Sequence, residues 1–200
     1  MTTGQRGRPR SFDRARALDQ ATLTFWEHGY EATSVAGLTR AMGIGAPSLY
    51  AAFGDKKALF DEVVGAYGQT YGVFIRRAFA EESGARATIG RILREAATEF
   101  TQTGRPRGCL VLSAAVNCTS REVEEALREV RDGNLAEFER LIAADVVTGA
   151  LPAGTDPRAL ARFSVAVFQG MSQQARDGAP EEELAAVAEL AMRGWPEQRD

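Results

Sequence analysis

The sequence has few of the side chains that hold metals or serve as catalytic bases. It contains one histidine and two cysteines in 200 residues, and no two of them lie at the spacing of zinc ligands. The lone His28 allows at most one histidine base, and neither a nucleophile-elbow motif nor a phosphate-binding loop motif occurs. We therefore expect no metal, no cofactor and no enzymatic activity.

Long apolar runs are also absent. The longest nearly uninterrupted run, 108–116, is far shorter than the roughly 20 residues that cross a bilayer. The basic N-terminus has no apolar core behind its charges, so it does not resemble a secretory signal. With 44% apolar and 26% charged residues, the composition is that of an ordinary globular protein. We expect a soluble cytoplasmic chain with no membrane partner.

The charge is divided unevenly along the chain. The net charge of −3 argues against a polyanionic partner. However, residues 1–57 carry eight Lys and Arg against five Asp and Glu, or +3, whereas residues 58–200 carry 16 against 22, or −6. This asymmetry suggests an N-terminal unit that faces a polyanion, attached to an acidic body with another task.

Apolar residues recur at helical spacing along almost the whole chain, and no stretch alternates with a period of two. Glycine and proline clusters separate the helical patterns. An all-α fold of about nine helices is predicted. Their approximate bounds are 13–28, a short helix that Thr33 or Ser34 caps and that ends at Met42, 46–53, 55–82, 85–103, 108–118, 121–147, 156–177 and 181–194.

The segment 33–60 has the spacing of a helix-turn-helix. Two short helical patterns flank the turn Gly43-Ile44-Gly45, and such a unit places its second helix in the major groove of DNA. We expect the buried side to be Leu38, Met42, Leu49 and Phe53, and the outward side to be Ala46, Pro47, Ser48, Tyr50, Ala51 and Ala52. The same spacing also fits an ordinary helical corner in an interaction protein without specific DNA binding.

Residues 12–60 resemble the DNA-binding domain of the TetR/AcrR family of transcriptional regulators. The matching positions are Phe25, Gly29-Tyr30, Thr33, Ser34, Leu38, Gly43, Ser48-Leu49-Tyr50, Phe53, Lys56 and Leu59. The resemblance implies a helix-turn-helix DNA-binding domain at 12–57 and an effector-binding and dimerisation domain at 58–200. It also implies a repressor that binds a near-palindromic operator as a homodimer. Residues 1–11 are polar and rich in arginine and glycine, which is typical of a flexible basic arm.

The same resemblance assigns roles to residues of the head. Thr33 and Ser34 open the second helix and are both assigned to the DNA-binding surface. Ser34, Tyr50 and Lys56 are expected to hold phosphates. The positions that touch bases in the family carry Ala46, Pro47, Ser48 and Ala51 here. These side chains are mostly small, so we expect sparse hydrogen-bond readout. The arm with Arg6, Arg8 and Arg10 either enters the minor groove or adds nonspecific phosphate affinity.

The body is expected to dimerise and to bind an effector. The family pattern assigns the dimer interface to the last two helices, with Leu160, Phe163, Val167, Met171, Leu184, Val187, Leu190 and Ala191. A pocket for a hydrophobic or aromatic small molecule is expected near Tyr67, Tyr71, Phe74, Leu93, Phe100, Leu110 and Phe168. Both sets also fit the core of the protomer. Cys109, close to Arg105 and Arg107, is either a small buried residue or a redox or electrophile sensor.

Overall fold

The computed structural model describes residues 12–116 and 118–197, and these residues form ten helices and no strand. The predicted all-α class is confirmed. In chain order the helices are α1 (Arg14–Ala32), α2 (Val35–Met42), α3 (Ala46–Phe53), α4 (Lys56–Thr70), α5 (Val73–Glu81), α6 (Ala85–Thr101), α7 (Leu110–Ser113), α8 (Arg121–Thr148), α9 (Pro157–Arg176) and α10 (Glu181–Arg193).

Two of the predicted helices are wrong in extent. The expected helix 55–82 is divided into α4 and α5, because the Gly72 N–H bonds to the Tyr67 carbonyl, one residue beyond the regular helical partner. The expected helix 108–118 is only the four residues of α7. The Ala114 carbonyl accepts from the Tyr30 N–H at 2.8 Å instead of continuing a helical ladder.

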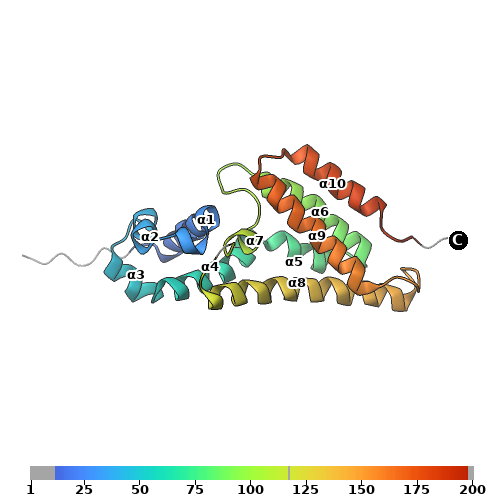
Figure 1. Ribbon diagram of the computed structural model, residues 1–200, viewed down its shortest axis with the longest axis horizontal. Coiled ribbons are helices and arrows are strands. Elements are labelled where there is room, and N and C mark those ends of the chain that lie inside the picture. Colours follow the sequence, from blue (N-terminus) through green and yellow to red (C-terminus); the bar gives the residue numbers. More distant parts are fainter. Residues whose placement is uncertain (1–11, 117, 198–200) are drawn as a thin grey trace, which may run out of the picture.

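The N-terminal helices α1, α2 and α3 form a head at one end of the molecule (Figure 1). Its core contains the fully buried Phe25, Leu38 and Leu49. Arg14 ties α1 to both α3 and α4, since its guanidinium lies 4.4 Å from the centre of the Phe53 ring of α3 and pairs with Glu62 of α4. The head is therefore packed against α4, which leads into the body.

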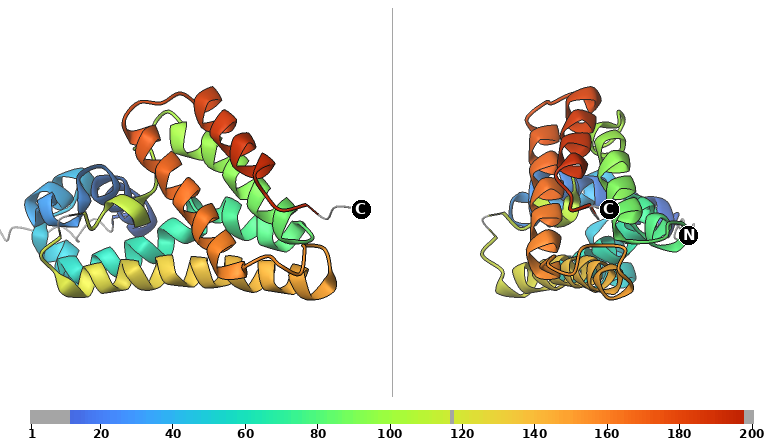
Figure 2. Two further views of the ribbon diagram at one scale, coloured as in Figure 1. Left: turned by 45° about the vertical axis from the view of Figure 1, so that its right-hand side comes forward. Right: turned by 90° about the vertical axis from the view of Figure 1, so that its right-hand side faces the viewer.

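The body is built from the remaining helices (Figure 2). Helix α8 runs along one side of the molecule from the head to the far end, while α6, α9 and α10 pack against one another above it. The core continues from the head into the body without a break. No helix among the described residues is long and apolar enough to span a membrane. The described residues also contain no cluster of three or more His, Cys, Asp or Glu side chains that could hold a metal ion.

Candidate nucleic-acid interface and effector cavity

The turn between α2 and α3 is set by local hydrogen bonds. Gly43 ends α2 in the left-handed conformation, with φ of 68°, and the Ile44 N–H returns to the Thr39 carbonyl at 3.1 Å. This is the pattern of a Schellman cap, in which glycine avoids the strain of a positive φ. Leu38, Leu49 and Phe53 are buried as predicted. Their packing fixes α3 against α2 and turns its other face outward.

The outward face of α3 consists of small side chains around one tyrosine. Ala46, Pro47, Ser48 and Ala51 are exposed, and the Tyr50 side chain is 53% exposed. Ala52 differs from the expectation because it is half-buried and packs against the core. The arm residues Arg6, Arg8 and Arg10 lie outside the described residues.

The polar residues assigned to the DNA-binding surface near α2 and α4 differ in how their side chains are already bound within the protein. Ser34 is exposed and caps α2 by accepting from the Gly37 N–H at 3.0 Å, so its own hydroxyl proton can still be donated. Lys56 starts α4 with its ammonium 4.2 Å from the centre of the Tyr30 ring, and burial lowers its pKa. Thr33 is a correction, because it is buried and its hydroxyl donates to the Gly29 carbonyl at 2.6 Å. Its role is internal.

The predicted dimer residues separate by burial. Phe163 on α9 is 44% exposed and Leu190 on α10 is 63% exposed, while Leu160, Val167 and Val187 are half-buried. The expectation is wrong for three residues, which are buried inside the protomer and not at its surface: Met171, Leu184 and Ala191. These three close the core between the helices of the body and leave little surface for a second chain.

An apolar cavity of about 240 Å³ lies between α4, α5, α7, α8 and α9. Of the predicted pocket residues, only Tyr67 and Phe168 line it. Phe74, Leu93, Phe100 and Leu110 are buried core residues, and Tyr71 packs on Trp26 at the boundary of the head. The lining that the sequence did not suggest includes Ile75, Arg76, Val130, Arg131, Asn134, Val165 and Gln169.

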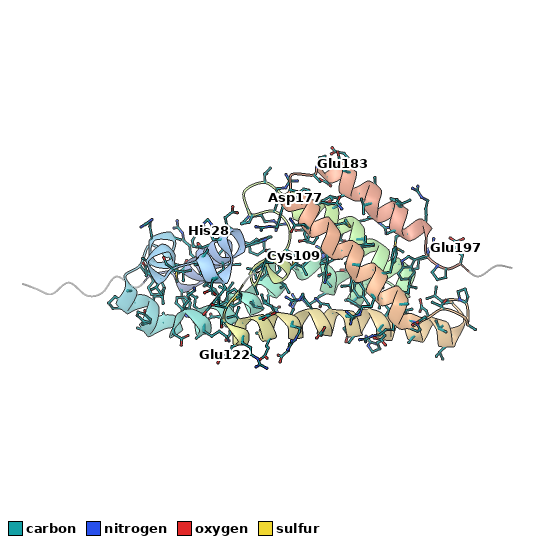
Figure 3. All side chains as sticks on the ribbon, viewed as in Figure 1. His28, Cys109, Glu122, Asp177, Glu183 and Glu197 are labelled. Atoms are coloured by element: carbon teal, nitrogen blue, oxygen red, sulfur yellow. The ribbon has the colours of Figure 1, made fainter. Side chains whose placement is uncertain are left out.

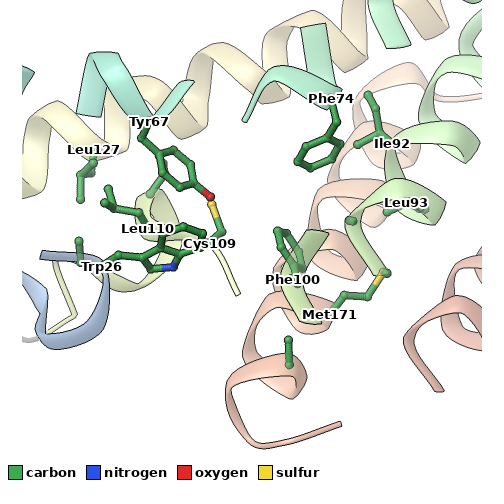
Figure 4. Packing of buried hydrophobic residues seen from close by; sticks show 14 of the residues in the cluster. Trp26, Tyr67, Phe74, Ile92, Leu93, Phe100, Cys109, Leu110, Leu127 and Met171 are labelled. Carbon is green, nitrogen blue, oxygen red and sulfur yellow. The ribbon is translucent and has the colours of Figure 1, made fainter. Parts of the chain in front are cut away.

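Cys109 also lines the cavity, but its environment disfavours the thiolate. The residue is buried, the Tyr67 hydroxyl points at its sulfur (Figure 4), and burial raises the pKa of the thiol. Arg105 engages Glu99 and the rings of Trp26 and Tyr71. A reactive cysteine needs an electropositive, accessible site, so the sensor hypothesis is not favoured. Cys109 and Cys118 are both free thiols, and they do not share one helix.

The cavity walls are in contact with the head. Tyr67 packs edge-on against Trp26 of α1, with ring centres 5.1 Å apart. The segment that follows α7 also contacts the head, because the Ala114 carbonyl accepts a hydrogen bond from the Tyr30 N–H. Figure 3 shows His28 on the head and Cys109 at this boundary. Sequence periodicity does not predict these contacts, because they join segments that are far apart in the chain.

A third contact joins the head to the start of α8. The Glu31 carboxylate accepts from the Thr119 hydroxyl at 2.8 Å and from the Thr119 N–H at 3.2 Å. These hydrogen bonds lower the pKa of Glu31. The head is thus connected to the body through α4, through the segment after α7 and through the start of α8.

Comparison with known proteins agrees with this architecture. Residues 17–63 match the model of "Bacterial regulatory proteins, tetR family", and residues 86–189 match "Tetracyclin repressor-like, C-terminal domain". The HTH-type transcriptional repressors ComR and BdcR of Escherichia coli K12 are 35% and 30% identical. The alignments cover 96% and 92% of this chain, and 93% and 90% of the two repressors.

A solved structure is similar over nearly the whole length. It is a cysteine mutant of the TetR family transcriptional regulator CifR complexed with 26-bp double-strand operator DNA. The sequences are 42% identical, the match covers 95% of this chain and all of the other, and the TM-score is 0.88. From its helix-turn-helix head to its C-terminal helical body, the chain belongs to the TetR family of bacterial regulatory proteins.

Proposed function

We propose that the chain is a ligand-responsive transcriptional repressor that binds a near-palindromic DNA operator as a homodimer. The observation that carries this proposal is the exposed α3 face, held by the buried Leu38 and Leu49 in a member of the TetR family. The operator complex of the 42% identical CifR mutant supports a role in binding double-stranded DNA.

In this proposal α3 enters the major groove and its ends are fixed by phosphates. Tyr50, Ser34 and the ammonium of Lys56 bind the backbone, while Ala46, Pro47, Ser48 and Ala51 face the base edges. Of the four residues that face the base edges, only Ser48 has a side chain that can form hydrogen bonds. Methyl contacts with thymine and the shape of the operator then supply much of the specificity.

Dimerisation uses the exposed stripe of α9 together with α10. Ala159, Phe163 and Ala166 follow one another at helical spacing and are exposed, and Leu190 is exposed on α10. A two-fold axis between such faces presents two copies of α3, which requires two half-sites in the DNA. The larger side chains, Phe163 and Leu190, supply the apolar centre of this interface.

The effector acts from the cavity beside the head. A small hydrophobic or aromatic molecule between Tyr67 and Phe168 changes the position of Tyr67, and Tyr67 packs on Trp26 of the head. The effector shifts the dimer toward the state that it binds better. If that state has its two α3 helices out of register with the grooves, effector and operator weaken each other's binding by the same factor.

The test begins with an operator selected by the protein itself. Genomic fragments that the immobilised full-length chain retains are sequenced, and affinity for the enriched duplex is measured by fluorescence anisotropy. Tyr50→Phe and Lys56→Gln should weaken binding, and Lys56→Gln should also lower the salt slope by about one. Arg140→Gln is the matched control, since Arg140 is an exposed arginine in the second half of α8.

The selection has two outcomes that contradict the proposal. One is a pool without an enriched, near-palindromic sequence, which is the result expected of a helical interaction protein. The other is equal operator affinity for the head variants and for Arg140→Gln. Thermal denaturation of each variant shows whether the Lys56 substitution, which removes a contact with Tyr30, also changes the fold.

A further inference from the structure

We propose that the cavity between α4, α5, α7, α8 and α9 takes a small apolar acid, whose carboxylate is bound by Arg131. This inference rests on the proposed function, in which the same cavity is the effector site. It adds the chemical class of the effector, namely an apolar body that carries one negative charge.

The lining of the cavity carries positive charge. Among the described residues, the side chains around the cavity include Arg76 and Arg131 but no aspartate or glutamate. This is unusual for its surroundings, because residues 58–200 carry 22 acidic side chains against 16 basic ones. A cavity with a net positive lining inside an acidic domain favours an anionic ligand over a neutral or cationic one.

Arg131 has no counter-ion among the residues that the structure describes. It is half-buried, and the hydrogen bond found for its side chain within 12–116 and 118–197 goes to the Val111 carbonyl at 3.1 Å. No carboxylate among the described residues lies within ion-pair distance of the Arg131 guanidinium. By contrast, the guanidinium of Arg128, one turn earlier on α8, lies 3.9 Å from the Glu125 carboxylate. A partly desolvated guanidinium gains from a bound carboxylate, to which it can donate two parallel hydrogen bonds.

A polar hollow of about 250 Å³ lies next to the cavity and shares part of its lining. The two spaces share Arg131, Leu112 and Gln169, and the hollow also includes Arg176, which does not line the cavity. The lining of the hollow also lacks carboxylates among the described residues. Arg131 therefore stands where an apolar space meets a polar one, which orients a ligand with one apolar end and one charged end.

The apolar end of the ligand is limited by the size of the cavity. Ile75, Phe138, Val165 and Phe168 form much of its apolar lining. A cavity of about 150 Å³ holds benzene, and this one has about 240 Å³. The space therefore fits one ring, or a short alkyl chain, with a short acidic side chain.

The experiment compares acids with their neutral amides on the full-length protein. Binding is measured by isothermal titration calorimetry, without DNA, for 3-phenylpropionate, 4-phenylbutyrate, hexanoate and octanoate and for the four matching amides. At least one acid should bind about tenfold or more tightly than its amide, as expected for a charge-assisted hydrogen-bonded pair. Arg131→Gln should abolish that preference, and Arg128→Gln should preserve it.

The inference is overturned if none of the four acids binds, if each amide binds as well as its acid, or if Arg131→Gln retains the preference. The comparison of acid with amide in the unsubstituted protein stays decisive even if Arg131→Gln misfolds. Operator release by the same compounds is measured separately. An acid that binds through Arg131 but leaves operator affinity unchanged supports the site and contradicts the proposed release mechanism.

Discussion

Gly29 gives a sharp test of how the head is joined to the body. Its φ of 77° and ψ of 169° interrupt α1, in a region that is open almost only to glycine and that costs other residues about 1–3 kcal/mol. An alanine Cβ at this position would also lie 3.3 Å from the Ala114 carbonyl oxygen, which the Tyr30 N–H binds. Loss of that hydrogen bond adds about 1 kcal/mol.

Gly29→Ala should therefore lower the free energy of unfolding by about 2–4 kcal/mol, the sum of these two effects. Urea denaturation followed by circular dichroism measures it. Gly65→Ala is the control, because Gly65 lies within α4 with no atom near the added Cβ, and it should stabilise the protein by about 0.5–1 kcal/mol. Equal or greater stability of Gly29→Ala than of the unsubstituted chain would refute the reasoning.

Three further predictions concern the dimer, the thiol and the link to α8. Phe163→Glu should convert the dimer to a monomer in analytical ultracentrifugation, whereas Val147→Glu, at an apolar position of α8 that is 87% exposed, should not; equal behaviour of the two contradicts the proposed interface. Iodoacetamide at pH 7 should leave Cys109 of the native protein unmodified in peptide mass spectra, since burial raises the pKa of its thiol; rapid alkylation would restore the sensor hypothesis. Because the pKa of Glu31 is lower in the folded protein, its carboxylate stabilises the fold at pH values above its ordinary pKa of 4.5. This stabilisation is lost as the pH falls through the lower pKa of the folded state. Glu31→Gln should therefore reduce the loss of stability over that acidic range, as measured by urea midpoints against pH, and an unchanged profile contradicts the assignment.

The sequence predicts the head well because its structure depends on local signals. A cap at Thr33 or Ser34, the end of α2 at Gly43 and the burial of Leu38 and Leu49 follow from spacing and residue type, and the structure shows Ser34 as the cap. The body is harder, since its features depend on contacts between distant segments. The division of a helix at Gly72 and the early end of α7 come from hydrogen bonds that periodicity does not show.

The site residues show the same limit. Apolar side chains indicated a pocket region, but five of the seven predicted residues do not line the cavity. Helical spacing does not distinguish a core residue from a residue of a cavity wall. Thr33 has the residue type of a phosphate contact, yet its hydroxyl is bound by the Gly29 carbonyl. The sequence did not indicate a binding role for Arg131. That its guanidinium has no carboxylate partner among the described residues can be seen only in the folded structure.

The most direct test of the account is the salt dependence of affinity for the selected duplex. We predict that the logarithm of the association constant falls steeply with the logarithm of salt concentration, with a slope of about −0.9 for each phosphate neutralised. The slope should become shallower for Lys56→Gln and stay the same for Arg140→Gln. A slope near zero, or one that is identical for both variants, would contradict DNA binding through the α3 face and the start of α4.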